Sequence, residues 1–307
     1  MLVSVAIPVR NGAAYLPSVL DAIRAQRGVE GEVELVVVDS ASTDGSAELC
    51  ERAGARVERI RPEEFSHGGT RNRLMELTRG ERVAFLTQDA VPAHDGWLAA
   101  LLGGFAREEN VGLVCGPYLP RPDASPMVRR ELDEWFASIP ALVRGPLGPD
   151  PQPGPHTFFS SANGAVSRAA WSRVPFREVP YAEDQRLAVD MMEAGYAKAY
   201  VPEAGVVHSH DYPPLERFRR WFDEFRALRE VYDFRAPLAP RPVLGRIRTE
   251  VARDRAAAGD RIVWESLCYH TLRALGAGLG TRADRLPAGV RRWCSLERRA
   301  TYHPSHP

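Results

Sequence analysis

The sequence predicts an α/β fold in which a mostly parallel sheet has helices on both faces and a helical extension follows. Three observations predict it. Short runs of β-branched and aliphatic residues recur through residues 1–90, helix-like segments separate them, and each run ends on polar or acidic residues. Such runs are typical of parallel strands that are buried on both faces. Because open sheets bind ligands beyond the carboxyl ends of their strands, the sequence predicts one polar site at that edge.

The first part of the chain alternates strands with helices. We expect strands at 2–8, 32–39, 55–60, 82–86 and 111–115, and helices at 15–26, 46–53, 68–77 and 96–107. Short turns that contain Gly or Asp connect them, as in successive βαβ units.

The regular alternation of strands and helices ends after the fifth strand. Segment 117–155 is rich in proline, with one amphipathic stretch at 128–139, and we expect a long irregular insertion that is a binding loop or disordered. Regular structure resumes at 158–167, and we then expect a helix that starts at 168, a helix at 184–194, and short strands at 197–201 and 205–208. From residue 214 the pattern is helical and arginine-rich.

Composition narrows the class of protein. The 307 residues include 40 basic and 40 acidic side chains, so nothing calls for nucleic acid as a partner. Four scattered cysteines without a CxxC pair argue against a zinc knuckle or a disulfide framework. The chain opens on a strand pattern and has no run of 18 apolar residues. We expect a cytoplasmic protein, at most peripheral to the inner face of the cell membrane.

Two motifs suit a nucleotide. Asp39 ends the second strand, where a carboxylate can accept hydrogen bonds from a base or a ribose. Asp44 and Ser46 follow it and either contact the ligand or cap the next helix. Residues 67–72 (HGGTRN) place two glycines at a helix start, where backbone N–H groups suit a phosphate and Arg71 can pair with the same anion. Alternatively, the glycines only make the turn.

Three other segments of the chain carry acids or histidines. Asp89 follows the strand 82–86 and either holds Mg²⁺ or Mn²⁺ against a diphosphate or is a solvated turn residue. His208 and His210 end the last strand and either complete a metal site or lie on the surface. Glu183 and Asp184 open a helix, where acids complement the helix dipole or accept a proton from an attacking hydroxyl.

Taken in order, these motifs resemble a known family. The segments IPVRN, VVVDSASTDGS, HGGTRN, FLTQDAVP, SANGAVSRAAW, AEDQ and VVHSHDY are similar to those of the family 2 glycosyltransferases with a GT-A fold, and among them the bacterial rhamnosyltransferase-like members. The resemblance covers roughly residues 2–212. It implies a GT-A (Rossmann-like) catalytic domain at 1–212, with a nucleotide-sugar half at about 1–115 and an acceptor half at about 116–212, and a helical extension at 213–307.

The resemblance also implies roles for individual residues. The donor side comprises Pro8, Arg10, Asn11, Asp39 and Ser40 for the base and ribose, and His67, Gly68, Arg71, Gln88 and Asp89 toward the diphosphate. Asn163 and Gly164 line the acceptor side, Asp184 is the catalytic base, and Glu183 is its partner in the ED motif.

The metal site departs from the family pattern. Asp89 matches the metal-binding acid of the DxD motif, whereas Thr87 and Ala90 replace acids that usually flank it. Either His208 or His210 therefore helps to bind Mg²⁺ or Mn²⁺, or metal binding is weak.

The function implied is inverting transfer of a sugar from a nucleotide diphosphate to a hydroxyl of a glycan or lipid-linked glycan, in polysaccharide or cell-wall assembly. The residues of HGGTRN and FLTQDAVP resemble those of rhamnosyltransferases more than those of glucosyl- or mannosyltransferases. This resemblance indicates dTDP-L-rhamnose as the donor. A sugar nucleotidyltransferase is the main alternative, but segment 9–12 is too short for its glycine-rich, basic loop. A second alternative is a degenerate, non-catalytic nucleotide-binding module, which the altered DxD motif suggests.

The C-terminal helices match no diagnostic motif. In the first of them, apolar residues recur at helical spacing between arginines: Phe218, Trp221, Phe222, Phe225 and Leu228. This pattern fits an interfacial helix that contacts a membrane or a second subunit in a homodimer. Burial against the catalytic domain is the alternative.

Overall fold

The computed structural model describes residues 2–148 and 150–297, and its chain forms two compact units. The first unit comprises residues up to 121 together with 135–179 and 183–208, and the second comprises 122–134, 180–182 and the chain from 209 on. The predicted division at residues 212 and 213 stays a prediction, because contacts alone do not define independent folding. Residues 298–307 of the predicted extension lie outside the described residues.

The first unit is built on an eight-stranded sheet of order β3-β2-β1-β4-β9-β6-β10-β8. Its strands are β1 (Leu2–Val9), β2 (Glu32–Ser40), β3 (Arg56–Ile60), β4 (Arg82–Leu86), β6 (Val111–Cys115), β8 (Leu142–Val143), β9 (Asn163–Ser167) and β10 (Ala197–Tyr200). Strands β3, β2, β1 and β4 run parallel, as do β6 and β10, while β9 is antiparallel to both β4 and β6. The predicted mostly parallel α/β sheet is therefore confirmed.

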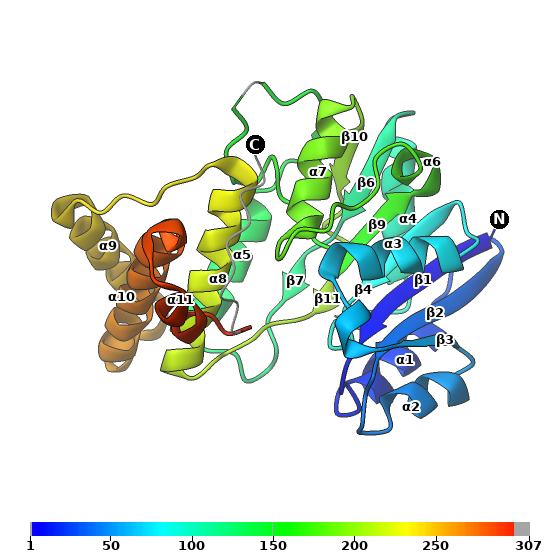
Figure 1. Ribbon diagram of the computed structural model, residues 1–307, viewed down its shortest axis with the longest axis horizontal. Helices are drawn as coiled ribbons and strands as arrows, with labels where there is room; N and C mark the ends of the chain where they lie inside the picture. The colour runs from blue at the N-terminus through cyan, green and yellow to red at the C-terminus, as the bar shows by residue number, and fades with distance from the viewer. Residues whose placement is uncertain (1, 149, 298–307) are drawn as a thin grey trace. The chain divides into compact units, whose positions relative to one another are not determined.

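Helices cover both faces of this sheet. They are α1 (Leu16–Arg24), α2 (Ser46–Arg52), α3 (His67–Leu77), α4 (Trp97–Gly103), α6 (Arg168–Trp171) and α7 (Glu183–Glu193). Helices α1 and α2 lie on one side of the β1–β3 edge and α3 lies on the other (Figure 1). Right-handed crossovers require this, because the chain steps outward from β1 to β3 and then returns to β4. Most predicted helix ends differ from the observed ones by one or two residues.

Of a second, three-stranded sheet, only the middle strand lies within a predicted strand, that at 205–208. This sheet consists of β5 (Val91–Pro92), β11 (Val206–Val207) and β7 (Tyr118–Leu119), in that order. Two-residue strands are too short to show a period of two in the sequence. The antiparallel pairing of Val207 with Val91 places the residues just before β5 beside those just after β11. This pairing brings Asp89 close to His208.

Segment 117–155 is more regular than predicted. It contains β7, β8 and the helix α5 (Pro126–Ala137), which carries the amphipathic stretch. Proline at the first helical position costs no hydrogen bond, because the N–H groups of the first turn have no partner within the helix. The expectation of a wholly irregular insertion was therefore wrong. The prolines mark the ends of short elements.

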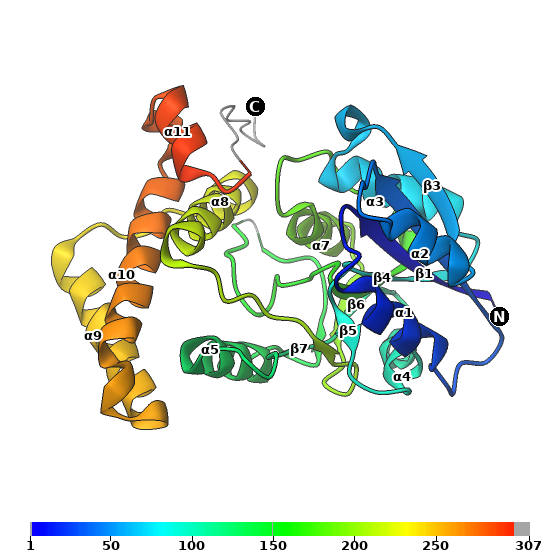
Figure 2. The same cartoon turned by 90° about the horizontal axis from the view of Figure 1, so that it is seen from below.

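The second unit contains α8 (Pro214–Tyr232), α9 (Pro240–Ala258), α10 (Val263–Gly280) and α11 (Ala288–Cys294). Helix α10 lies between α8 and α9 (Figure 2). Glycine lets α8 approach closely, since a Cβ at Gly280 would lie 2.5 Å from the carbonyl oxygen of Phe222. Phe218, Trp221 and Phe222 are buried in this contact region, so the apolar side of α8 is covered within the second unit. Among the described helices, none is both long and apolar enough to cross a membrane.

Candidate active site

The loops after β1 and β2 are tied together at the carboxyl edge of the sheet. Asn11 has a left-handed backbone (φ 51°), its N–H donates to Ser42 Oγ at 2.8 Å, and its Oδ1 accepts from the Thr43 N–H at 2.9 Å. Asp39 is 2% exposed, and its Oδ2 accepts from the Ser42 N–H at 3.0 Å. Its Oδ1 is buried and has no hydrogen-bond partner within residues 2–148 and 150–297. A buried carboxylate oxygen without a hydrogen-bond donor is unusual in a folded protein. A donor group on a bound ligand would explain it.

Two further side chains shape the same edge. The Gln88 amide accepts from the Arg10 N–H at 2.8 Å and donates to the Arg10 carbonyl at 3.1 Å, so it joins the ends of β1 and β4. Ser46 Oγ accepts from the Gly12 N–H and donates to Asp44, whose pKa this hydrogen bond lowers. Asp44 and Ser46 thus hold the loop after β1. Pro8 and Ser40 lie near the ends of β1 and β2.

The glycines of HGGTRN serve packing. Ser66 caps α3 by accepting from the Gly69 N–H at 3.1 Å. A Cβ at Gly68 would lie 2.0 Å from the Arg177 carbonyl oxygen, so only glycine permits this backbone approach. His67 packs edge-on against Phe65. Gly68 therefore has a structural role in helix packing. The turn alternative and phosphate binding by Gly68 or His67 both stay predictions.

Arg71 takes part in a buried ion pair. Its Nη1 lies 2.8 Å from Glu183 Oε1, and the two residues are 6% and 4% exposed. Arg71 also donates from Nε to Ser161 Oγ at 2.6 Å and from Nη1 to the His67 carbonyl at 3.0 Å. The structure thus joins two motifs that the sequence left separate, HGGTRN and the Glu183–Asp184 pair. Its guanidinium is held by protein groups, so its predicted contact with the donor phosphates stays a prediction.

Asp184 lies beside this ion pair. Its Oδ2 accepts from the Ser161 N–H at 3.2 Å and its Oδ1 accepts from the Gln185 N–H at 2.8 Å. Burial, followed by the charge of Glu183, raises the pKa of Asp184 to about 6, while Arg71 and the two N–H donors oppose the rise. A carboxylate of this kind is fixed in direction and more basic than an ordinary aspartate. It is suited to accept a proton near neutral pH.

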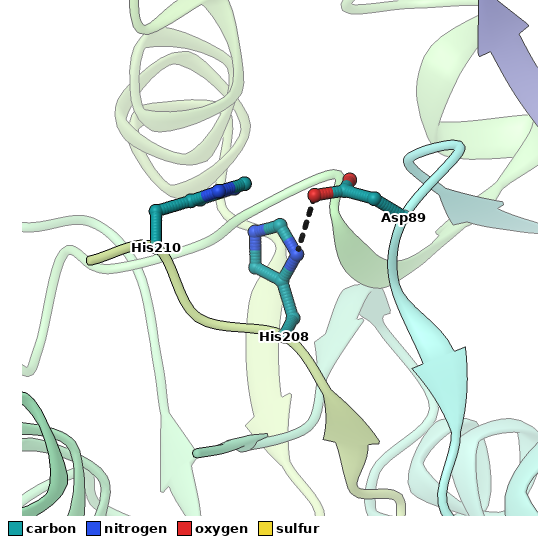
Figure 3. A group of neighbouring side chains, drawn as sticks. All are labelled: Asp89, His208 and His210. Carbon is teal, nitrogen blue, oxygen red and sulfur yellow. Dashed lines mark ion pairs between the residues drawn. The ribbon is translucent and has the colours of Figure 1, made fainter. Parts of the chain in front are cut away.

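Asp89 and His208 form the candidate metal centre. His208 Nδ1 lies 3.4 Å from Asp89 Oδ2, and the His208 ring packs edge-on against Tyr118. His210 follows two residues later, and one potential ligand atom from each of the three side chains lies within 4.8 Å of the others (Figure 3). One carboxylate and two imidazoles form a donor set that fits a divalent transition metal.

Arg121 lies beside the same carboxylate and was missed by sequence reasoning. Its Nη2 donates to the Asp89 carbonyl at 2.8 Å and lies 3.7 Å from Asp89 Oδ2, while its guanidinium stacks over Tyr15. It follows a two-residue strand in the proline-rich segment, where no motif marked it.

Asn163 and Gly164 are fully enclosed. Asn163 is 0% exposed, accepts from Trp97 Nε1 at 2.9 Å and donates to the carbonyls of Pro117 and Ala204. A Cβ at Gly164 would lie 2.6 Å from the Ser160 carbonyl oxygen. Any contribution of this pair to acceptor binding is therefore indirect, through the position of the 160–162 loop.

Comparison with known proteins identifies the family. The model of glycosyl transferase family 2 matches residues 4–173, which is more than half of the chain. The chain belongs to glycosyl transferase family 2. The resemblance read from the sequence motifs is thereby confirmed, and with it the assignment as a glycosyltransferase.

Relatives of this glycosyltransferase include two from Salmonella. The O-antigen chain rhamnosyltransferase RfbN of Salmonella typhimurium is 34% identical over 73% of this chain and 71% of its own. The O-antigen chain rhamnosyltransferase WbaN of Salmonella anatum is 34% identical over 62% of this chain and 61% of its own.

Among solved structures, the mannosyltransferase PcManGT of Pyrobaculum calidifontis, in complex with GDP-Man and Mn²⁺, has a TM-score of 0.62. It is 22% identical, and the match covers 92% of this chain and 86% of that one. Identity at this level shows the fold alone. The predicted GT-A fold of this glycosyltransferase is thereby confirmed.

The buried ion pair of Arg71 makes a stability prediction. We expect Arg71→Met to lower the free energy of unfolding by about 3–5 kcal/mol, because Glu183 is left as a buried, unpaired charge. Arg73 lies on the same helix, is 47% exposed in its side chain and pairs with Glu58 and Glu76. Arg73→Met is therefore the matched control, with an expected loss below about 1 kcal/mol. Urea denaturation followed by circular dichroism measures both.

The double variant Arg71→Met with Glu183→Gln should regain most of the loss, since neither charge then remains unpaired. Equal losses for the Arg71 and Arg73 variants would contradict the ion-pair assignment.

Proposed function

We propose that this family 2 glycosyltransferase is an inverting rhamnosyltransferase. It transfers L-rhamnose from dTDP-L-rhamnose to a hydroxyl of a glycan or lipid-linked glycan acceptor. The observation that carries the proposal is the Asp184 carboxylate, which two backbone N–H groups fix and whose pKa is raised to about 6. Such a group matches the requirement for a general base that works near neutral pH.

The proposed reaction is a single displacement. As the acceptor hydroxyl attacks the anomeric carbon, its proton passes to Asp184, the new C–O bond forms, and the bond to the diphosphate breaks. Attack from the face opposite the diphosphate inverts the anomeric configuration. The proton on Asp184 then returns to solvent. Ser161 holds the base through its N–H and holds Arg71 through its hydroxyl, so one residue of the loop positions both.

The donor assignment rests on the relatives and on one physical argument. The two Salmonella relatives are named O-antigen chain rhamnosyltransferases, and they cover 73% and 62% of this chain. Rhamnose has a methyl group where hexoses carry a hydroxymethyl group, so its pocket can be apolar at that point. One buried methyl contributes only about 1 kcal/mol. Rejection of a hydroxylated sugar is then modest, roughly a hundredfold.

The metal proposal rests on the donor set of Asp89, His208 and His210. Imidazole nitrogens favour a transition metal, so we assign Mn²⁺ rather than Mg²⁺ to this centre. When bound, the ion neutralises charge on the leaving diphosphate. The guanidinium of Arg121, 3.7 Å from Asp89 Oδ2, is placed to contact the same diphosphate. Arg71, which the Glu183 carboxylate engages, stays a second candidate for this contact.

The base assignment predicts a pH dependence. Asp184 acts as a base only when ionised, and its pKa is raised to about 6, so turnover should rise with pH through about 6 and then level off. Asp184→Asn should lower turnover by about two to four orders of magnitude and leave dTDP affinity nearly unchanged. Stopped assays of sugar transfer across a pH series, with calorimetry for dTDP, measure both. A loss below tenfold would assign the base to Glu183 or another group.

The metal assignment predicts chelator-sensitive binding. Affinity for dTDP should fall on addition of chelator in the wild type and should be insensitive to chelator in Asp89→Ala. Arg121→Met should weaken dTDP binding and yet strengthen Mn²⁺ binding without nucleotide, because it removes a positive charge beside the carboxylate. Electron paramagnetic resonance of free Mn²⁺ measures the second effect. Equal dTDP affinity with and without metal in the wild type would refute the metal centre.

The donor assignment predicts an order of affinities. Calorimetry with dTDP, UDP and GDP should show dTDP as the tightest ligand of the three diphosphates. A clear preference for UDP or GDP would overturn the donor and leave the base and the metal centre in place.

A further inference from the structure

Helix α10 of the second unit has one side that the described residues leave exposed. Its buried side includes Ser266, Tyr269 and His270. The opposite side is uncharged and mostly apolar along the helix: Trp264 (79% exposed), Leu267 (37%), Cys268, the partly exposed Thr271, Leu275 (51%) and Leu279 (36%). At 3.6 residues per turn these six side chains fall within about a third of the circumference. We call them the α10 stripe, and no charged residue interrupts it.

A continuous row of this kind needs an explanation. Single exposed apolar side chains are normal, whereas a contiguous exposed patch marks an interaction surface. The neighbouring helices α8 and α9 pack on other sides of α10 (Figure 2). Trp264 is the most exposed large apolar side chain among the described residues. Within the part of the chain that the structure describes, no helix or strand therefore covers the stripe.

Arginines border the stripe on the side of α9. Arg241, Arg248 and Arg255 are exposed and recur at helical spacing on the side of α9 that carries Leu244 and Val251. A groove of about 240 Å³ connects this row to the stripe, because Arg248, Val251 and Arg255 of α9 line it together with Leu267 of α10. Residues 240–297 contain eleven arginines against six acidic residues. Arg255 pairs with the exposed Asp260, so Arg241 and Arg248 give the border its net positive charge.

We propose that the α10 stripe and the α9 arginine row dock this protein on an anionic bilayer surface. The helix would lie in the plane of the interface, with Trp264 and the leucines among the acyl chains and the arginines at the lipid phosphates. Tryptophan favours this boundary because its ring is amphipathic. The inference is independent of the donor and of the catalytic base. It assigns the membrane contact to α10 and α9 instead of α8, whose apolar side is buried.

A second copy of the chain fits this face less well. A two-fold contact would place the same patch of each subunit against the other. The arginine row of one copy would then border that of its partner, and like charges oppose such an arrangement. An anionic lipid surface supplies the opposite charge. Charge complementarity therefore favours the bilayer.

Cys268 offers a site-specific probe. It lies in the stripe and is exposed, whereas Cys50, Cys115 and Cys294 are buried. The full chain, labelled at Cys268 with an environment-sensitive fluorophore, should show a blue shift when phosphatidylglycerol-containing vesicles are added. Pure phosphatidylcholine vesicles should give a much weaker response, and added salt should reduce the response to the anionic ones. No shift, or no binding in vesicle co-sedimentation, would overturn the proposal.

Unlabelled variants test the two components separately. Leu275→Gln should weaken vesicle binding about tenfold, and Leu215→Gln, an exposed leucine of α8, is its control. Arg248→Gln should weaken binding about fivefold, while Arg246→Gln, exposed on the other side of α9, should have little effect. All four should keep the wild-type circular dichroism spectrum and midpoint of thermal unfolding, which shows that they fold. Equal effects of test and control variants, or a concentration-dependent dimer that buries the Cys268 label without lipid, would refute membrane docking by this face.

Discussion

The site depends on one buried ion pair, that of Arg71 in α3 with Glu183 in α7. Two charges inside a protein are tolerated only when the remaining polar atoms are also satisfied. Arg71 meets this condition with the Ser161 hydroxyl and the His67 carbonyl, so the pair fixes two helices and a loop in one arrangement. Asp184 is the next residue after Glu183, and Ser161 also donates to it. The pair therefore helps to set the position of this carboxyl group. Burial is the main cause of its raised pKa, the charge of Glu183 adds to the rise, and Arg71 opposes it.

The ends of β1, β2 and β4 are held in place by individual hydrogen bonds. Gln88 joins the ends of β1 and β4, and Asn11 joins the loops after β1 and β2. The three-stranded sheet then sets Asp89 beside His208. The ends of β1 and β2, the carboxylate–imidazole pair and Asp184 are thus each positioned by protein groups. Preorganisation of this kind is what electrostatic stabilisation of a leaving diphosphate requires.

The sequence predicted the positions of strands and helices better than the contacts between residues that are far apart in the chain. Strands 82–86 and 111–115 were placed correctly, because buried apolar runs are a local signal. Arg71 and Glu183 are 112 residues apart, and a donor role and a structural role for the arginine look the same in a sequence. Arg121 had no motif around it. The apolar set of α8 and the α10 stripe are both patterns of period 3.6, and only packing shows which one is covered.

The pH dependence of turnover in Glu183→Gln tests most directly whether the ion pair tunes Asp184. The charge of Glu183 raises the pKa of Asp184, and Arg71 lowers it. Replacing Glu183 with neutral glutamine removes the first effect and leaves Arg71 to act on Asp184 alone. The acid limb of the rate profile should therefore move to lower pH than in the wild type, for which we expect it near 6. An unchanged limb, or a shift to higher pH, would contradict the claim that this ion pair tunes the catalytic base.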